Sequence, residues 1–178
     1  MKEMLVSMEG KVIKVGRGGP ESRTGQFLGG GDDYFVLLTK EDGVVYFHGQ
    51  HLKSLTEKTK GGLGESFEAP MGFSVLNGST FSDILSQLEL TWVTINRGGP
   101  EKIEGVLNRV NADYVSVIVN EEVIRLPIFH IKSISTGVVA SENTENQDSS
   151  SNNSSSNNSS NSNNGGGDFV ARSKNRRR

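Results

Sequence analysis

One five-residue segment, Arg-Gly-Gly-Pro-Glu, occurs twice in this chain and constrains the fold more than any other feature. The two copies occupy residues 17–21 and 97–101, and each is followed by a glycine, an Asp-Tyr pair and a His-x-Lys-Ser segment. Matching positions are 80 residues apart up to the tyrosine and 79 apart at the histidine. This constant spacing predicts an internal repeat of two units that differ by one residue in a hairpin loop.

The repeated residues are mostly types that shape a backbone. Gly-Gly-Pro is poorly suited to the interior of a helix or strand, so each copy is predicted to form a tight connection. The matched positions are Arg17, Gly18, Gly19, Pro20, Glu21, His51 and Lys53 in the first unit, and Arg97, Gly98, Gly99, Pro100, Glu101, His130 and Lys132 in the second. We interpret them as a structural or interaction motif.

Each unit is predicted to begin with a short helix. Apolar residues stand at helical spacing in both units, as Met4, Leu5 and Met8 in the first and Ile84, Leu85 and Leu88 in the second. The second helix has an N-cap candidate at Ser79 or Thr80 and an acidic residue, Asp83, in its first turn.

Five short strands are predicted to follow each helix. Segments with alternating apolar and polar residues, or rich in β-branched residues, are separated by residues that favour turns. The first four lie near residues 11–15, 25–28, 34–39 and 44–47, with counterparts at 91–95, 105–108, 114–119 and 123–126. The fifth contains His-x-Lys-Ser. The fourth strands are predicted to bury Val45, Phe47, Ile124 and Leu126 and to direct Tyr46 and Arg125 outward.

This layout predicts a mainly β protein with two tandem small SH3-like or Sm-like β-barrel units, whose closure would remove exposed strand edges. The predicted boundaries are 1–59 for the first unit, 60–78 for a connector, 79–137 for the second unit and 138–178 for a tail. All sixteen residues from 149 to 164 are Ser or Asn, so the tail is predicted to be disordered before its basic end. Candidate phosphorylation sites are Ser149, Ser150, Ser151, Ser154, Ser155, Ser156, Ser159, Ser160, Ser162 and Ser173.

Catalytic chemistry is not predicted. Arg17 and Arg97 beside their glycines could form a small anion site, but a simple bend already explains the motif. His51 and His130 are better explained by a shared packing position than by metal binding, since no second ligand stands at the usual spacing on the same strand. His48 with His51 is a weak exception, in the first unit only. No catalytic residue, metal ligand or cofactor site is assigned, and the chain is expected not to be an enzyme.

Net charge and composition limit the classes of binding partner that this chain is expected to have. The formal net charge is −2, so a nucleic-acid partner is not expected, although an Sm-like barrel leaves RNA or DNA binding as the alternative function. There is no cysteine, and no stretch has the length or character of a membrane span or signal peptide. Synthesis in the cytoplasm is therefore expected, and a homo-oligomer is left open.

Three quoted segments carry a family resemblance: WVTINRGGPEKIEGVL, DDYFVLLTKEDGVVYFHGQHLKS and FHIKSIS. Together with a Ser-rich tail that has basic residues, they resemble the spore coat protein B family of Bacillus over roughly residues 4–137. The resemblance implies a structural protein of the outer spore coat, made in the mother cell and deposited on the forespore. It also implies other coat proteins as partners, including the coat protein H kinase, whose targets include tail serines in that family.

Overall fold

The structure is a computed structural model that describes residues 2–57, 67 and 74–136 of the 178-residue chain. Most of the predicted connector lies outside the described residues. So do the predicted tail, its candidate phosphorylation serines and its basic end.

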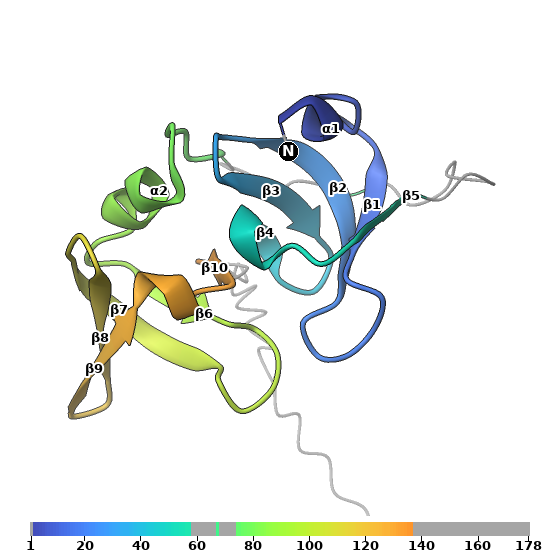
Figure 1. Cartoon of the computed structure of the whole chain (residues 1–178). Coiled ribbons are helices and arrows are strands. Elements are labelled where there is room, and N and C mark those ends of the chain that lie inside the picture. Colours follow the sequence, from blue (N-terminus) through green and yellow to red (C-terminus); the bar gives the residue numbers. More distant parts are fainter. Residues whose placement is uncertain (1, 58–66, 68–73, 137–178) are drawn as a thin grey trace, which may run out of the picture. The chain divides into compact units, whose positions relative to one another are not determined.

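The described chain falls into two halves with the same succession of elements (Figure 1). The first half contains α1 (Lys2–Val6), β1 (Val12–Val15), β2 (Arg23–Gly30), β3 (Tyr34–Thr39), β4 (Gly43–His48), the 3₁₀ helix η1 (Gly49–His51) and β5 (Leu55–Glu57). The second contains α2 (Phe81–Gln87), β6 (Trp92–Ile95), β7 (Ile103–Val110), β8 (Tyr114–Val119), β9 (Glu122–Pro127), the 3₁₀ helix η2 (Ile128–His130) and β10 (Ser133–Ser135).

All ten described strands belong to one antiparallel sheet, in the order β5-β1-β2-β3-β4-β10-β6-β7-β8-β9. The prediction of a mainly β protein with short helices is confirmed. Two closed barrels are not shown, because among the described strands β4 pairs with β10 rather than with β5. The free edge of the first half is thus covered by the last strand of the second, and the sheet stays open at β5 and β9.

The two halves also repeat the same backbone hydrogen bonds. Three bonds of the first half each have a counterpart about 80 residues further along with nearly the same length. The pairs are Phe27 N–H to Lys11 O (2.9 Å) with Leu107 N–H to Thr91 O (2.9 Å), Gly31 N–H to Tyr34 O (3.0 Å) with Asn111 N–H to Tyr114 O (2.9 Å), and Gly16 N–H to Ser54 O (2.9 Å) with Asn96 N–H to Ser133 O (3.0 Å).

The hydrophobic core consists of two clusters, one within the first half and one that contains residues of both halves. The smaller lies within the first half, around Ile13, Phe35 and Leu37. The larger combines residues of the second half with Tyr34, Val36 and Tyr46 of β3 and β4. Apolar burial is the main stabilising contribution to a fold, so this shared cluster stabilises the two halves as one unit.

Tyr46 corrects one prediction. It was expected to face outward, but its side chain is only 2% exposed. The reason is tertiary: β10 pairs alongside β4, and the Tyr46 hydroxyl accepts a hydrogen bond from the Leu76 N–H at 2.8 Å. Its counterpart Arg125 is exposed as expected, because no described strand pairs with the outer edge of β9.

Other local predictions fare unevenly. Helix α2 begins as predicted: Thr80 is the N-cap and forms a reciprocal capping box with Asp83. Strands β2 and β7 begin before the predicted residues, and β2 continues through Gly29, where a bulge absorbs the register shift. The histidines of His-x-Lys-Ser lie on η1 and η2 rather than on the fifth strands, which begin further along.

Candidate functional site at the joint between the halves

The two Arg-Gly-Gly-Pro-Glu turns meet in space. Gly98 is buried, and a Cβ atom added there would collide with the backbone of Pro20 and Glu21. At Gly99 an added Cβ would lie 3.7 Å from the Pro20 ring. The repeated turns therefore form a backbone-to-backbone contact between the halves, and glycine is required at Gly98 for close approach.

Substitution of Gly98 by Ala is expected to lower the stability of the folded chain by about 1–3 kcal/mol, the usual cost of overpacking a buried site. The added methyl group meets backbone atoms of Pro20 that cannot rotate away. Urea denaturation measures the change. The matched control is Gly18→Ala, where no atom lies within 4 Å of the added Cβ, although its φ of +155° adds some strain. A larger loss at Gly18 than at Gly98 would contradict this contact.

Lys132 connects the glutamates of both motifs. Its Nζ lies 2.5 Å from Glu101 Oε2 and 3.9 Å from Glu21 Oε1. Asn96 positions the segment, because its Oδ1 accepts from the Lys132 N–H at 2.7 Å and its Nδ2 donates to the His130 carbonyl at 2.9 Å. Glu21 and Glu101, the last residues of the two motifs, are thus linked through Lys132, which is itself a matched position of the repeat.

Arg97 forms a buried ion pair between the two halves. We call this region, where the repeated turns meet and β4 pairs with β10, the joint. Its side chain is 9% exposed, and its Nη1 pairs with Asp42 Oδ1 of the β3–β4 hairpin. Arg23 Nε contacts the other oxygen, Asp42 Oδ2, at 2.5 Å. Burial lowers the pKa of the Arg97 guanidinium and Asp42 opposes that shift, so this carboxylate offsets part of the cost of burying the charge.

His48 closes the joint at the other end of β4. Its backbone N–H donates to the Lys132 carbonyl at 3.0 Å, and its Nδ1–H donates to the Ile131 carbonyl at 3.2 Å. Its ring stacks on Phe81, the first residue of α2, with centroids 4.6 Å apart. Burial lowers the pKa of the His48 imidazole despite the hydrogen bond to Ile131, so the neutral ring is favoured in the folded chain.

The direction of this shift predicts a pH dependence. A histidine whose folded-state pKa lies below its unfolded value of about 6.5 stabilises the fold fully above that pH. Stability should fall as the pH drops below about 6.5 toward the lower folded-state pKa, because the unfolded chain then binds more protons. The free energy of unfolding is measured by urea denaturation between pH 8 and pH 5. His48→Gln should flatten the slope in this window, and an unchanged slope would contradict the assignment.

The other residues predicted from the sequence have different environments in the two halves. His51 Nε2–H donates to the Phe129 carbonyl at 2.6 Å, so this histidine also joins the halves, whereas His130 is exposed beside the Phe129 ring. Arg17 and Lys53 are exposed and do not share the buried ion pair of Arg97. The same motif arginine therefore has two different environments in the two halves.

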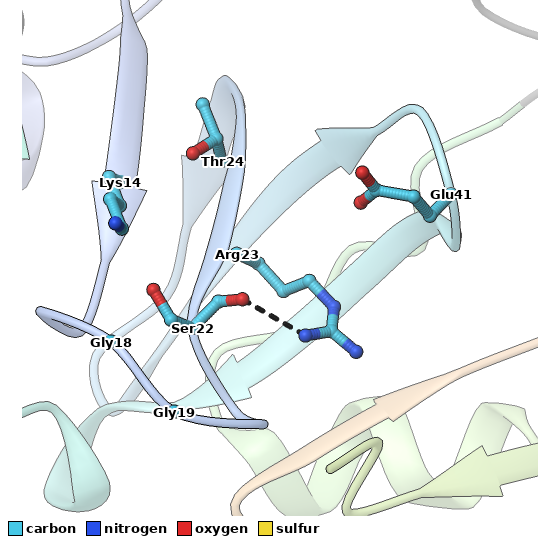
Figure 2. A pocket seen from close by; sticks show the side chains of 7 residues that line it. All are labelled: Lys14, Gly18, Gly19, Ser22, Arg23, Thr24 and Glu41. Carbon is cyan, nitrogen blue, oxygen red and sulfur yellow. Dashed lines mark hydrogen bonds between the residues drawn. The ribbon is translucent and has the colours of Figure 1, made fainter.

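Two cavities lie beside the first turn. One of about 720 Å³ is lined by residues that include Arg17, Glu21, His51, Lys53 and Lys132. The other, of about 520 Å³, is shown in Figure 2 with Lys14, Ser22, Arg23, Thr24 and Glu41 around it. Both have side chains of mixed charge at their walls, and the larger one also has apolar walls from Phe35, Phe47 and Leu52. The predicted anion site at Arg17 would lie in the larger cavity, where it stays a prediction.

The joint's chemistry is that of a structural contact. Among residues 2–57, 67 and 74–136, no group of three His, Asp or Glu side chains is placed to hold a metal ion. Within the same residues, no helix has the length and apolar character needed to cross a membrane. Asp42 pairs with Arg23 and Arg97, and Lys132 pairs with Glu101 and, at 3.9 Å, with Glu21, so these carboxylates form ion pairs.

Sequence reasoning missed several residues of the joint. Asp42 precedes Gly43 in a dipeptide that is typical of a hairpin turn and gives no sign of an ion pair, and the predicted motif does not include Asn96 or Phe81. Asn96 did carry a signal: its counterpart is Gly16, and both have positive φ, 51° and 73°. An Asn and a Gly at one repeat position, directly before the motif, mark a left-handed backbone position.

Fold and site together define a class: an antiparallel β protein of two like halves, joined by strand pairing and by contacts between its repeated turns. The chain is 45% identical over 136 residues to spore coat protein B of Bacillus subtilis (strain 168), which confirms the predicted resemblance to the spore coat protein B family. The match covers 76% of this chain and about a third (35%) of the relative's length. No protein-family model matches the chain.

Proposed function

We propose that this protein is a structural component of the outer spore coat, which assembles through protein–protein contacts of its repeated β units. The observation that carries the proposal is the 45% identity to spore coat protein B over 136 residues, 76% of the chain. In this proposal the protein is made in the mother-cell cytoplasm, is deposited on the forespore surface and has no catalytic role.

The geometry of the joint supports a structural role. The repeated residues Gly98 and Lys132 are used for contacts between the halves, against Pro20 and Glu21 of the first motif. We interpret the two halves, about 1–59 and 79–137, as copies of one duplicated unit related to SH3-like or Sm-like folds. Each half has the strand order fifth-first-second-third-fourth, and the edge that would close a barrel is used to join the halves.

Partners follow from this role. Other spore coat proteins are the expected partners, and the coat protein H kinase is a candidate modifier of the tail serines. Neither proposal depends on the cavities beside the first turn.

Localisation tests the proposal. A fluorescently tagged full-length chain, expressed from its own promoter in a sporulating Bacillus, should collect around the forespore and be recovered from mature spores in coat extracts. The Asp42→Ala variant, which removes the partner of the buried Arg97, should be incorporated poorly, while the exposed counterpart Glu121→Ala should be incorporated normally. A tagged chain dispersed in growing cells and absent from spores would overturn the proposal. Salt-sensitive RNA binding would then favour the Sm-like alternative.

A further inference from the structure

The open sheet has two edges, and both resemble strands that are already paired inside the molecule. In the described part of the chain, no strand pairs with the outer side of β5 or of β9. Strand β9 is the counterpart of β4, since Leu126 opposes Val115 as Phe47 opposes Phe35. Strand β5 is the counterpart of β10, since Leu55 opposes Val15 as Ile134 opposes Ile95. The two open edges are therefore the two sides of the internal β4–β10 joint.

Burial differs sharply between the paired strands and their unpaired counterparts. Five of the six residues of β4 are buried and all of β10 is buried, whereas no residue of β9 or β5 is. Tyr34 is 3% exposed but its counterpart Tyr114 is 38% exposed, and Val123 on β9 is 52% exposed. Apolar side chains left exposed along an unpaired edge are typical of a surface that receives another strand.

We propose that β9 of one copy pairs with β5 of a second copy of this chain, in the antiparallel register of the internal joint. The internal register places Phe47, Tyr46 and Val45 opposite Ser133, Ile134 and Ser135. Translated to the open edges, it places Leu126 opposite Ser54, Arg125 opposite Leu55 and Ile124 opposite Thr56. The contact is head-to-tail, so a pair of copies keeps one open β5 edge and one open β9 edge and can extend the assembly.

Backbone direction supports this register. The His48 N–H donates across the joint to the Lys132 carbonyl, so alternate residues of β4, including Tyr46, direct their backbone groups toward β10. By correspondence, the backbone groups of Val123 and Arg125 point to the open edge of β9. On β5, the Ser54 carbonyl accepts from Gly16 on the β1 side, which leaves Leu55 to face outward.

A proline and one pair of opposite charges affect the strength of the proposed contact. Pro127 occupies the position of His48 and has no N–H, so the external contact lacks one hydrogen bond that the internal joint makes. Arg125 and Glu57 become diagonal neighbours on one face, at a distance that long side chains of opposite charge can span. The external contact is therefore weaker than the internal joint, and assembly should depend on protein concentration. This inference specifies a partner for the proposed coat role but does not depend on where the protein is deposited.

Engineered cysteines test the register, because the natural chain has none. Two purified full-length variants, Thr56→Cys and Ile124→Cys, are mixed under mild oxidation and run on a non-reducing gel. The expected product is a dimer of one chain of each kind. The control replaces the second variant by Val123→Cys, which faces the opposite side of the strand and should cross-link about tenfold more slowly, since disulfides need close and aligned Cβ atoms.

A preference for Ile124→Cys pairing with itself would overturn the proposal in favour of a symmetric contact of β9 with β9. Equal rates for the two mixtures would overturn the register. Sedimentation of the cysteine-free chain gives a second measurement. Arg125→Pro removes the central outward donor of β9 and should weaken self-association about tenfold without changing the melting temperature by more than a few degrees. A chain that stays monomeric at millimolar concentration would also overturn the proposal. None of these results depends on localisation to spores.

Discussion

Replacing Asp42 by Ala is expected to lower the free energy of unfolding by about 3–5 kcal/mol, which is the cost of leaving a buried charge without its partner. Arg97 is 9% exposed and pairs with this carboxylate, so its guanidinium cannot regain the water that would otherwise compensate. Its Nε and Nη2 have no hydrogen-bond partner among the described residues, so these atoms do not compensate for the lost carboxylate. Equilibrium denaturation in urea measures the change.

The repeat provides the control for this prediction. Glu121 occupies the position of Asp42 in the second half, but it is exposed. Glu121→Ala should therefore change the free energy of unfolding by no more than about 0.5 kcal/mol. The double variant Asp42→Ala with Arg97→Met should recover much of the lost stability, because it removes the unpaired charge. Equal effects at Asp42 and Glu121 would contradict a buried ion pair at the joint.

Phe81→Ala is expected to cost about 3–5 kcal/mol, the range for truncating a fully buried aromatic side chain. Phe81 is 1% exposed and belongs to the larger core cluster. It also joins the halves directly, since its ring stacks on His48 of β4 and its N–H donates to Asp33 Oδ1 at 2.6 Å. The substitution leaves a cavity between α2 and the first half, and thermal and urea unfolding measure the loss.

Trp92 is the matched control for Phe81. It is a larger aromatic residue in the same half but is 59% exposed. Trp92→Ala should cost far less than Phe81→Ala, although it removes more atoms, because little of the indole is withdrawn from water on folding. If both substitutions cost the same, Phe81 is not packed between the halves as described.

Much of the fold could be predicted from the sequence because local patterns specify local structure. Alternation along the first strands places Ile13 and Val15, or Val93 and Ile95, on one face, and all four residues are buried. The capping box at Thr80 and Asp83 was equally visible, since it depends on residues three positions apart. The repeat predicted matching elements, and the succession of helices and strands is the same in the two halves.

The joint could not be predicted, because it depends on which strand covers which edge. In one arrangement the fourth strand of a half pairs with the fifth strand of the same half, and in the other it pairs with the fifth strand of the other half. Both arrangements place the same residues on the same strands, so the sequence pattern does not distinguish them. The outward assignment of Tyr46 was wrong for this reason, since β10 covers it. For the same reason the motif arginines Arg17 and Arg97 look identical in sequence, while only Arg97 is buried against Asp42. The hairpin residue Asp42 gave no local sign of its ion pair.

Hydrogen exchange at the β4–β10 joint tests most directly whether the two halves form one unit. The His48 amide, which donates to the Lys132 carbonyl, is compared with the amides of Phe27 and Leu107, which lie within the first and second halves. A unit held by its joint predicts that all three amides exchange only by global unfolding, with equal free energies of opening. Exchange at His48 through a much smaller opening, while Phe27 and Leu107 remain protected, would show halves that separate freely and would contradict this account.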